Sequence, residues 1–583
     1  MRPAAPFVLL DDARPGAPPG RLYTRPVAVL EAWSDAEVRE VMATLRATSH
    51  HAAGFLSYEA AGAFEPRAAL PPGDTPLAWF GLFEDWEEVD AASWLPDAGG
   101  AAIGGPAPRV SPDAYDAMFG AVQALIGAGD LYQANLTIRA DVAIAGDPLA
   151  AYARLRGTTR AGWSAIVDTG RDLLLSFSPE LFFALEGRRA TCRPMKGTAR
   201  RGDDPATDDA AARALAIDPK QRAENLMIVD LMRNDLSRIA EPGSVRVPAL
   251  FSVERYPTVH QMTSTVTATL TPGAGASDVI AALFPCGSIT GAPKIRAIEA
   301  LAAIERDSRG AYTGAIGRID ANGDAQFNVA IRTLHIAQGA ETATIGIGGG
   351  IVADSRVDAE WDEALAKCAF LTHDARVFDL IETMAFDPVE GIVMIEPHLA
   401  RMKASAAALG FAFDRHAARN ELQAATFRLR HASAVRLLLA RSGAVAIEVS
   451  PAPAVFTAPL RVALAALPVD TRDIRLRHKT SDRGFYDRAR IPAGVDEVVF
   501  VTPDGQVTEG SFTNLFVERG DVLVTPPLAL GLLPGVLRDS LIEQGRAVEG
   551  AITPDMLTHG FLVGNALRGL MPARLLPGDR TVA

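Results

Sequence analysis

The segment IGIGGGIVADSRVDAEWDEALAKCAFL, residues 345–371, carries the pattern that decides the fold of the larger, N-terminal part of the chain. Its apolar start predicts a strand that ends in the three consecutive glycines, and a helix follows. On that helix Glu360, Glu363 and Lys367 take positions i, i+3 and i+7, so their side chains lie along one stripe. Two carboxylates and an ammonium group therefore share one face of the predicted helix.

This stripe is open to two interpretations. A solvated face with an ion pair between Glu363 and Lys367 is the ordinary result of such charge spacing. A binding site for a cation and an anion is the other. The glycines do not form a dinucleotide fingerprint, because they lack the GxGxxG spacing and the extended stretch IVADS follows them.

A second predicted helix adds another carboxylate. It begins at Asp218, has apolar residues at helical spacing from Met227 to Ile239, and contains Glu224. A further helix is predicted from Pro293, since proline is favoured in a first turn. Carboxylates on separate helices, with no cysteine partners, suit a hard cation such as Mg²⁺ better than zinc.

Composition excludes several classes of protein. The chain has 583 residues, 48% of them hydrophobic and 22% charged, which predicts two or more globular cores. The formal net charge of −13 disfavours nucleic acid and anionic membranes as main partners. An anionic substrate must therefore be met by local cations or by a metal ion.

Cysteine usage and hydropathy predict a soluble protein of the cytoplasm. Cys192, Cys286 and Cys368 are far apart and form no CxxC pair, which excludes a disulfide framework and a zinc knuckle. Asp11 and Asp12 cut short the apolar run at the N-terminus, so a signal peptide is not expected. No stretch approaches the ~20 apolar residues of a membrane span.

Eight segments, in this order, resemble the signature segments of chorismate-utilising enzymes. They are GDLYQANLT (129–137), SPELFF (178–183), PMKGTARRG (194–202), KQRAENLMIVDLMRND (220–235), FPCGSITGAPKIRAIEAL (284–301), GAYTGAIG (310–317), IRTL (331–334) and GGGIVADS (348–355) with the EWDEALAK helix. The resemblance covers roughly residues 50–372 and implies an anthranilate synthase component I-like fold, a β-sandwich with α+β character.

The resemblance gives Lys196 a chemical role. Aminodeoxychorismate synthases carry a lysine before the Gly-Thr of PMKGT, whereas anthranilate synthases carry a small residue there. By resemblance, Lys196 adds to C2 of chorismate and expels the C4 hydroxyl, and ammonia then enters at C4. The branch that adds water uses a lysine where this chain has Gln133, and a neutral amide cannot act as that base. An exposed loop cation is the alternative interpretation of Lys196.

The resemblance also implies roles for other positions. Glu180 is expected to be the general acid, with a structural ion pair as the alternative, and His260 a catalytic residue, with a structural histidine as the alternative. The residues expected beside the substrate are Gln133, Thr198, Tyr312, Arg332, Lys367 and the backbone amides near Gly348 and Gly350. The expected Mg²⁺ ligands are Glu224 and Glu363, with Glu360 and Gln221 as outer neighbours. Many relatives have glutamate at position 221, so one negative charge is missing here.

The source of ammonia is expected to be a separate chain. A glutaminase needs a cysteine nucleophile and a histidine base, and none of the three cysteines has the glycine-flanked elbow of an amidotransferase. The implied partner is a glutamine amidotransferase subunit, and ammonium salts should replace it.

The C-terminal part resembles class IV pyridoxal-phosphate enzymes, which include aminotransferases and aminodeoxychorismate lyase. The segments that carry this resemblance are LIETM (380–384), HLARM (398–402), RLRHKTSDRGFYDRAR (475–490), DEVVFVTPDGQVTEGSFTNLFV (496–517), LALGLLPGVLRDSL (528–541) and FLVGNALRGL (561–570). They imply that Lys479 binds the cofactor covalently, that Glu509 pairs with its ring nitrogen, and that Arg401, Gly535 and Val536 bind its phosphate. Ala566 stands where a phosphate-binding hydroxyl is common.

The pattern of the sequence changes near residue 373, where one set of family-like segments ends and the other begins. We therefore expect a synthase domain over 1–372, with an N-terminal region over 1–109 that ends in a loop over 96–109, and a catalytic region over 110–372. A class IV α+β domain follows over 376–583.

Together the two halves imply synthesis of 4-amino-4-deoxychorismate and then of 4-aminobenzoate, a folate precursor. The alternatives are an anthranilate synthase joined to an amino-acid aminotransferase, and a synthase with a non-catalytic C-terminal module. A homodimer is expected from the class IV resemblance.

Overall fold

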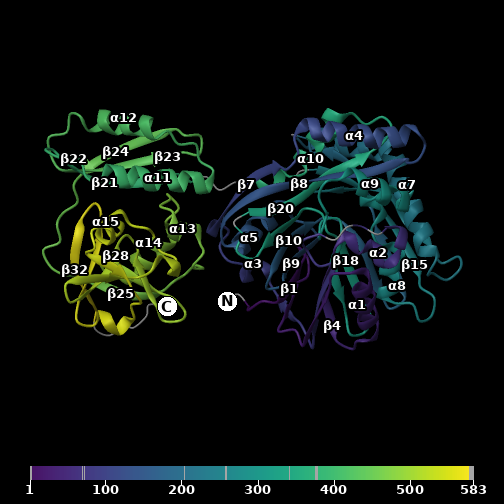
Figure 1. Ribbon diagram of the computed structural model, residues 1–583, viewed down its shortest axis with the longest axis horizontal. Helices are drawn as coiled ribbons and strands as arrows, with labels where there is room; N and C mark the ends of the chain where they lie inside the picture. Colours follow the sequence, from purple (N-terminus) through teal and green to yellow (C-terminus); the bar gives the residue numbers. More distant parts are fainter. Residues whose placement is uncertain are drawn as a thin grey trace. The chain divides into compact units, whose positions relative to one another are not determined.

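The computed structural model describes residues 3–68, 70, 73–202, 204–256, 259–340, 342–373 and 378–576 (Figure 1). The chain forms two compact units. The first unit contains Met1–Leu95, Gly105–Ala143 and Tyr152–Asp374, and the second contains Pro96–Gly104, Ile144–Ala151 and Ala375–Ala583. Residues 374–377, where the domain boundary was expected, lie outside the described residues.

The described residues up to 373 build two antiparallel sheets. One runs in the order β16 (Gly291–Ala292), β8 (Gln133–Gly146), β20 (Thr342–Ile351), β19 (Thr333–Ala337), β10 (Asp172–Ser178), β9 (Trp163–Asp168), β1 (Phe7–Asp11), β2 (Gly20–Thr24) and β6 (Glu87–Val89), with β7 (Ala101–Pro108) beside β8. The other runs in the order β13 (Met195–Arg200), β15 (Val259–Thr269), β12 (Arg189–Arg193), β11 (Leu181–Glu186), β18 (Ala325–Val329), β17 (Ala315–Ile319), β4 (His51–Leu56), β5 (Ala78–Phe83) and β3 (Ala28–Ala32), with β14 (Arg246–Arg255) beside β15.

The two sheets share a core. Val8 and Val167 from the first sheet and Phe55, Trp79 and Phe83 from the second belong to one buried cluster. Alternate residues of each strand point to the same face, so one face of each sheet is committed to this cluster. Because β1 pairs with β9 and β4 pairs with β17, the first 109 residues do not form a unit by themselves.

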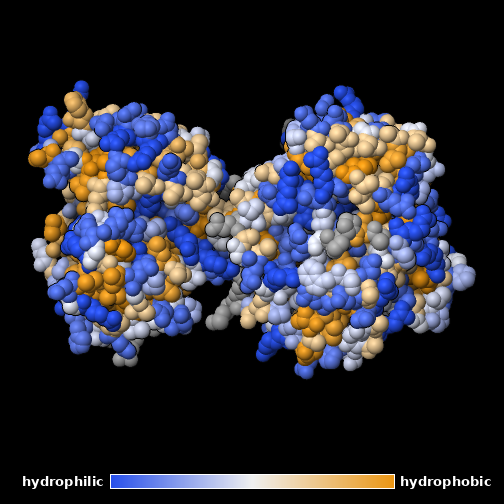
Figure 2. Space-filling model, in the orientation of Figure 1, coloured by the Kyte–Doolittle hydropathy of each residue, from blue (hydrophilic) through white to orange (hydrophobic). Residues whose placement is uncertain are grey.

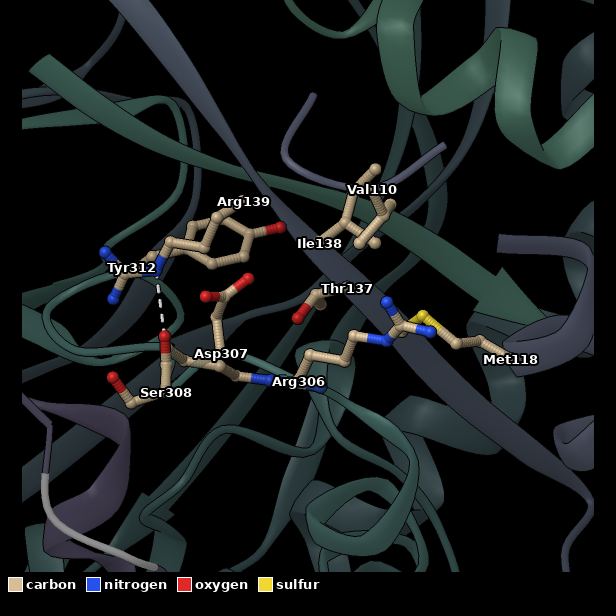
Figure 3. A pocket seen from close by; sticks show the side chains of 10 residues that line it. Val110, Met118, Thr137, Ile138, Arg139, Arg306, Asp307, Ser308 and Tyr312 are labelled. Atoms are coloured by element: carbon tan, nitrogen blue, oxygen red, sulfur yellow. Dashed lines mark hydrogen bonds between the residues drawn. The ribbon is translucent and has the colours of Figure 1, made fainter. Parts of the chain in front are cut away.

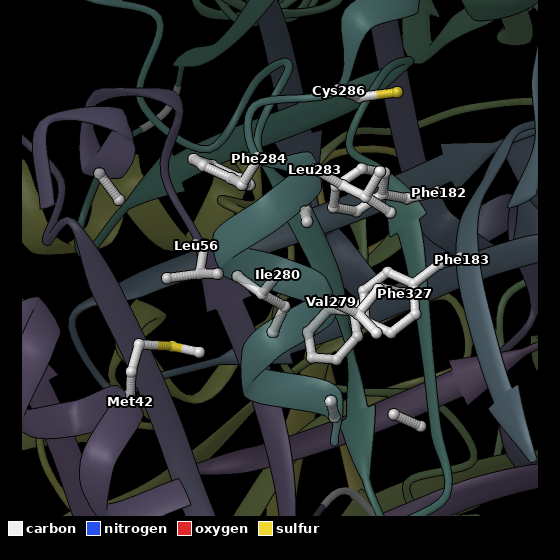
Figure 4. Close-up of a cluster of buried hydrophobic side chains, with 14 of the residues drawn as sticks. Met42, Leu56, Phe182, Phe183, Val279, Ile280, Leu283, Phe284, Cys286 and Phe327 are labelled. Atoms are coloured by element: carbon white, nitrogen blue, oxygen red, sulfur yellow. The ribbon is translucent and has the colours of Figure 1, made fainter. Parts of the chain in front are cut away.

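Helices cover the outer face of the second sheet (Figure 1). Val279 and Ile280 of α8 (Ala276–Leu283) belong to the same buried cluster as Phe183 and Phe327 (Figure 4). The rings of Phe183 and Phe327 stack with their centroids 5.3 Å apart. The other helices up to residue 373 are α1 (Asp35–Ala47), α2 (Ala61–Phe64), α3 (Ala91–Trp94), α4 (Pro112–Gly127), α5 (Pro148–Thr159), α6 (Pro205–Ile217), α7 (Pro219–Ser237), α9 (Lys294–Ile304) and α10 (Val357–Ala366).

One of the two predicted helix starts is confirmed, and the other is shifted by one residue. The Asp218 side chain accepts a hydrogen bond from the backbone N–H of Gln221 at 2.9 Å and caps α7, which confirms the predicted start. Pro293 is the residue before α9 rather than its first residue. The predicted strand before α10 is confirmed as β20, but it continues through its glycines to Ile351.

The prediction of a loop over residues 96–109 is wrong for most of that range. Ala101–Pro108 form β7, which pairs with the 14-residue strand β8. Glycine and proline weaken a strand locally, but pairing with a long neighbouring strand overrides that preference. Local composition could not reveal this partner.

The second unit contains a smaller and a larger sheet. The first is antiparallel, in the order β22 (Gly391–Ile392), β21 (Leu380–Asp387), β23 (Ser433–Leu439) and β24 (Val445–Pro451). The second runs in the order β27 (Val507–Gly510), β26 (Glu497–Val501), β25 (Leu460–Ala466), β32 (Gly569–Leu575), β31 (Phe561–Asn565), β28 (Asn514–Arg519), β29 (Val522–Thr525) and β30 (Ala547–Glu549). Its helices are α11 (Ile395–Leu409), α12 (Arg415–Thr426), α13 (Ile474–Arg477), α14 (Gly484–Ala493) and α15 (Val536–Glu543).

Local signals in the second unit explain how two of its elements end. Helix α11 ends at Gly410, whose φ of 70° is the left-handed conformation that glycine favours. The turn at PDGQ joins β26 to β27, with the N–H of Gly505 donating to the Thr502 carbonyl at 2.9 Å. Helix α11 packs its apolar side, including Leu399 and Met402, against Leu380 and Met384 of β21.

The visible surface is mixed in character. Figure 2 shows hydrophobic residues in small groups among hydrophilic ones on the face that it draws. In the described part of the chain, every helix is too short or too polar to cross a membrane.

Candidate active sites

Lys196 lies on β13 in the first unit, where three strands bring different residues together. A Cβ atom added at Gly350 of β20 would lie 3.4 Å from Lys196 Nζ and 2.2 Å from Gln133 Nε2 of β8. Only glycine allows this close approach of side chains to the backbone. The ammonium group of Lys196 makes no hydrogen bond or ion pair with the described residues, so it is available to a ligand.

Burial prepares Lys196 for nucleophilic chemistry. Its pKa is lowered, first because burial disfavours the charged form and second because Lys367 repels it, while Glu180, Glu224 and Glu363 act in the opposite direction. A lowered pKa increases the fraction of neutral amine at physiological pH, and the neutral amine is the nucleophile.

Glu180 lies between β10 and β11 and is 4% exposed. Ser288 donates a hydrogen bond from its hydroxyl to Glu180 Oε1 at 2.7 Å. Burial raises the pKa of Glu180 to about 7, although the Ser288 hydroxyl and the charge of Lys196 favour the ionised form. A carboxyl group with this pKa can both donate and accept a proton near neutral pH, as a general acid must.

The predicted metal ligands Glu224, Glu360 and Glu363 lie on α7 and α10. Ser355 donates to Glu360 Oε1 at 2.7 Å, and Lys367 pairs with Glu363 Oε1 at 2.9 Å. The second distance confirms the ion pair that charge spacing suggested. Tyr115 of α4 packs against Trp361, which fixes the orientation of α10.

These carboxylates suit Mg²⁺ in type but do not form a closed cage. Within the described ranges, no three or more His, Cys, Asp or Glu side chains are gathered as metal ligands. Burial raises the pKa of Glu224 and of Glu360, and repulsion by Glu363 adds to both shifts. Burial acts in the same direction at Glu363, but the charge and hydrogen bond of Lys367, with the charges of Lys196 and Lys220, lower its pKa.

Arg332 combines two unusual features. Its φ of 50° lies in the left-handed region, which is strained for a residue with a side chain. Burial lowers the pKa of its guanidinium, which makes no hydrogen bond or ion pair within the described residues. A half-buried cation without a partner fits the predicted role of binding a substrate carboxylate.

Tyr312 and the glycines of β20 lie against one another. A Cβ at Gly346 would lie 2.0 Å from the Tyr312 ring. Gly348 and Gly350 are part of β20, which pairs with β8 on one edge and with β19 only at Thr344 and Ile345. Backbone amides on the free part of that edge can approach an anion, and Lys367 Nζ donates to the Gly348 carbonyl at 2.7 Å.

A small cavity lies beside this region (Figure 3). Tyr312, Arg139 and Ser308 line it, and Arg139 Nε donates to the Ser308 carbonyl at 2.8 Å. Its volume of about 10 Å³ holds at most one water molecule. Neither Lys196 nor Glu180 lines it, so this cavity is not where a substrate would react.

Two other predicted residues are held by protein groups. His260 is fully buried, and its Nε2 lies 2.9 Å from Asp208 Oδ1. Arg201 lowers the pKa of Asp208 strongly, so that carboxylate is a permanent anchor for the ring and favours the structural interpretation of His260. Thr198 donates to Gln261 Oε1 at 3.1 Å. The catalytic role of His260 and the substrate contact of Thr198 stay predictions.

Lys479 is the centre of the site in the second unit. It follows α13, and its carbonyl accepts a hydrogen bond from the N–H of Ile381 at 2.8 Å. Burial, then the charges of Arg401 and Arg483, lower the pKa of Lys479 to about 7, although Glu382 acts in the opposite direction. No described residue forms a hydrogen bond or ion pair with its Nζ. A neutral, unpaired amine is what bonding to an aldehyde requires.

Glu509 lies in β27 and is 4% exposed. Tyr486 donates its hydroxyl to Oε1 at 2.6 Å, and the N–H of Leu533 donates to Oε2 at 3.0 Å. Burial raises the pKa of Glu509 to about 7, which the two donors partly offset. A protonated ring nitrogen opposite this carboxylate would form a charge-assisted hydrogen bond.

Arg401 is oriented by residues that the sequence interpretation did not single out. Its Nε and Nη2 donate to Glu382 at 2.8 and 2.6 Å, and its Nη1 donates to the Pro534 carbonyl at 2.9 Å. His398 Nδ1 lies 2.6 Å from the same carboxylate. Glu382 and His398 lie inside the segments LIETM and HLARM, so the motifs contained the signal.

The predicted phosphate-binding turn is tightly packed. Gly535 is the residue before α15, which starts at Val536. A Cβ at Gly535 would lie 1.7 Å from Asn514 Oδ1, so only glycine fits. An unpaired, half-buried amine, a carboxylate for a ring nitrogen and a helix N-terminus next to an arginine fit pyridoxal phosphate.

Comparison with known proteins finds a family for each part of the chain. The family model described as chorismate binding enzyme matches residues 6–373. The chain belongs to the family of chorismate binding enzymes. A second family model, amino-transferase class IV, matches residues 379–576, so the chorismate-binding fold is followed by a class IV aminotransferase-like fold, as predicted. The class IV match implies pyridoxal phosphate.

Individual relatives cover the first of these two matches. Aminodeoxychorismate synthase component 1 of Salmonella typhimurium is 45% identical over 259 residues, which are 44% of this chain and 57% of that protein. Anthranilate synthase component 1 of Streptomyces coelicolor is 42% identical over 243 residues, which are 42% of this chain and 47% of that protein. The chain thus spans about half the length of these curated relatives.

A solved structure supports the fold. The anthranilate synthase component I of Streptococcus pneumoniae superimposes with a TM-score of 0.54 at 25% identity, over 64% of this chain and 93% of that one. The expected resemblance to chorismate-utilising enzymes is therefore confirmed by sequence and by structure.

Proposed function

We propose that this chorismate binding enzyme makes 4-amino-4-deoxychorismate from chorismate and ammonia and then eliminates pyruvate to give 4-aminobenzoate, a precursor of folate. The observation that carries the proposal is the half-buried, unpaired Lys196 near Glu180, at the position where aminodeoxychorismate synthases carry lysine. Relatives with that activity support it.

The first reaction uses Lys196 as a transient nucleophile. Its neutral amine forms a bond to C2 of chorismate, the conjugated double bonds shift, and the C4–oxygen bond breaks. Glu180 gives its proton to the departing hydroxyl, which leaves as water. Ammonia then bonds to C4, the double bonds shift back, the Lys196 amine leaves C2, and Glu180 takes up the proton that the new amine releases. Chorismate and ammonia thus yield aminodeoxychorismate and water.

Substrate anions are met by cations in this proposal. Arg332, Lys367 and the amides on the free edge of β20 bind the carboxylates of chorismate, with Tyr312 next to that edge. Glu224 and Glu363, with Glu360 nearby, would hold Mg²⁺, which neutralises a substrate carboxylate when bound. Oxygen donors on two helices support this ion in preference to zinc.

The second reaction belongs to the class IV unit. Pyridoxal phosphate, when bound, supplies the electron sink that makes the proton at C4 of the aminodeoxychorismate ring acidic. Lys479 binds the cofactor and moves the C4 proton, Glu509 holds the proton at its ring nitrogen, and Arg401 with the N-terminus of α15 binds its phosphate. Loss of pyruvate then makes the ring aromatic.

The proposal includes partners and a location. A separate glutamine amidotransferase subunit supplies ammonia, because the three cysteines are buried and have raised pKa values caused by burial. Free thiols support a reducing compartment, the cytoplasm. Dimerisation through the second unit is also proposed.

A second candidate function has one observation in its favour. The identity to an anthranilate synthase, 42%, is close to that of the aminodeoxychorismate synthases. In that case Lys196 has no chemical role, and the C-terminal unit acts as an amino-acid aminotransferase. Lys196 at the position that separates the two activities favours the first candidate.

The deciding experiment is product analysis of the purified chain with chorismate, Mg²⁺ and ammonium, with and without pyridoxal phosphate. We expect 4-aminobenzoate with the cofactor and aminodeoxychorismate without it. Anthranilate, which is detected by its fluorescence, would show that the second candidate is right. Aminodeoxychorismate under both conditions would leave the C-terminal unit a non-catalytic module.

A further inference from the structure

Glu497, the first residue of β26, is a fully buried carboxylate that has no role in the reaction described above. Five donors surround it. Oε1 accepts from Val498 N at 2.9 Å, Ser511 N at 2.9 Å and Ser511 Oγ at 2.6 Å, and Oε2 accepts from Phe512 N at 3.2 Å and Thr513 Oγ1 at 2.7 Å. Its partners, Val498 excepted, lie in the turn between β27 and β28, which therefore folds around this carboxylate.

The two ends of this turn lead directly to groups of the cofactor site. Glu509 stands immediately before the turn, and Asn514 stands immediately after it. Both also contact Leu533 in the loop before α15: Leu533 N donates to Glu509 Oε2 at 3.0 Å, and Asn514 Nδ2 donates to the Leu533 carbonyl at 3.1 Å. The shape of the turn therefore sets the positions of Glu509 and of the N-terminus of α15 together.

The fit between Glu497 and the turn is close. A Cβ at Gly510 would lie 2.6 Å from Glu497 Oε2 and 2.3 Å from Thr513 Oγ1. A larger residue at 510 would displace the carboxylate. Removal of the carboxylate would leave several buried donors without an acceptor, and such donors are costly.

We propose that Glu497 is a positioning residue of the pyridoxal phosphate site: its carboxylate fixes the turn over residues 510–513, and the turn fixes Glu509 opposite the ring nitrogen. This inference rests on the proposed function of the second unit. Electrostatics supports it, because burial raises the pKa of Glu509 and the charge of Glu497 adds a smaller shift in the same direction. The two carboxylates are thus coupled as well as joined by the turn.

The test is a double-mutant cycle on the affinity for pyridoxal phosphate. The dissociation constant is measured by fluorescence quenching for the full chain, for Glu497→Gln, for Glu509→Gln and for the double variant. Glutamine keeps the shape of Glu497 but turns an NH₂ group toward donors, so we expect about tenfold weaker binding. The double variant should bind no more than about twofold more weakly than the weaker single variant, because both changes disturb the same contact. Fully additive losses would overturn the inference.

Controls separate folding from positioning. Glu518→Gln, at the exposed end of β28, should leave the affinity unchanged. If circular dichroism shows that Glu497→Gln does not fold, Thr513→Val and Ser511→Ala replace it in the test. Each of these variants removes one hydroxyl donor to Glu497 and should weaken binding of pyridoxal phosphate about threefold. Unchanged affinity in both would overturn the inference. A wild-type chain that binds no pyridoxal phosphate would contradict the proposed function itself, so the two failures are distinguishable.

Discussion

Lys196 in the first unit and Lys479 in the second are both half-buried, but they have different neighbours. Burial lowers the pKa of each lysine. Around Lys196 three carboxylates oppose that shift, whereas around Lys479 the arginines strengthen it and one carboxylate, Glu382, opposes it. Burial thus favours the neutral form of both amines, and the surrounding charges differ between the two lysines. Carboxylates beside Lys196 suit a cation that accompanies an anionic substrate, and arginines beside Lys479 suit a phosphate.

The largest expected effect separates the two lysines. Lys196→Ala should lower formation of aminodeoxychorismate by roughly 10³-fold or more, as loss of a covalent nucleophile does. Lys479→Ala should leave that step intact and stop formation of 4-aminobenzoate, so that the intermediate accumulates. Chromatography of the products measures both. Lys403→Ala, at an exposed lysine of α11, is the matched control and should behave as wild type. Loss of aminodeoxychorismate formation in Lys479→Ala, or conversion of added aminodeoxychorismate failing in Lys196→Ala, would break the comparison.

Substitution of Gly350, beside Lys196, and of Gly535, in the predicted phosphate-binding turn, tests whether the two sites work independently. Gly350→Ala should disturb Gln133 and Lys196 and lower the first reaction about tenfold. Gly535→Ala should disturb Asn514 and weaken binding of pyridoxal phosphate about tenfold, since overpacking costs about 1–3 kcal/mol.

The control for these glycines is Gly120→Ala in α4, where an added Cβ would contact nothing within 4 Å. Both activities should persist, and the free energy of unfolding should rise by about 0.5–1 kcal/mol. Equal effects of Gly350→Ala and Gly535→Ala on both reactions would contradict two independent sites.

The pH dependence of cofactor loading tests the environment of Lys479. Only the neutral amine bonds to the aldehyde, so the rate should rise with pH through about 7, the pKa to which burial and Arg401 lower Lys479. Stopped-flow absorbance of the apo chain mixed with pyridoxal phosphate measures it. A midpoint near the ordinary lysine value of about 10.4 would show that the amine is not held away from water.

The smallest effect concerns the proton on Glu180. Its acid form predominates below a pKa of about 7, so the first reaction should slow as pH rises through that value. Ser288→Ala removes a donor that favours the ionised form, and this raises the pKa of Glu180 further. The alkaline limb of the kcat profile should therefore move up by about one pH unit. Ser277→Ala, at a buried serine that donates to the Met42 carbonyl, should not move it.

Features set by local sequence were predicted. Helix α7 follows from apolar spacing and from its cap at Asp218, and the two lysines stand in motifs whose family resemblance was visible. Pairings between distant residues were not predicted. Strand β7 has a glycine-rich sequence and depends on β8, and Ser288 reaches Glu180 across 108 residues. Such contacts exist only after the chain has folded.

Within the two sites, too, motifs revealed residues, whereas contacts between distant residues could not be predicted. The sequence contained Glu382, His398 and Glu497, but their roles depend on hydrogen bonds that spacing does not reveal. His260 shows the reverse case, because a motif suggested chemistry and the structure pairs its ring with Asp208. Motifs thus indicated which residues take part, and the geometry showed what holds them.

The most direct test of the account mixes two inactive variants. The Lys196→Ala chain and the Lys479→Ala chain are each incubated with chorismate, Mg²⁺, ammonium and pyridoxal phosphate, separately and together, and 4-aminobenzoate is measured. The account predicts none from either chain alone and recovery of product from the mixture, because the intermediate made at Lys196 of one chain is consumed at Lys479 of the other. Product from either variant alone would contradict the assignment of one reaction to each lysine.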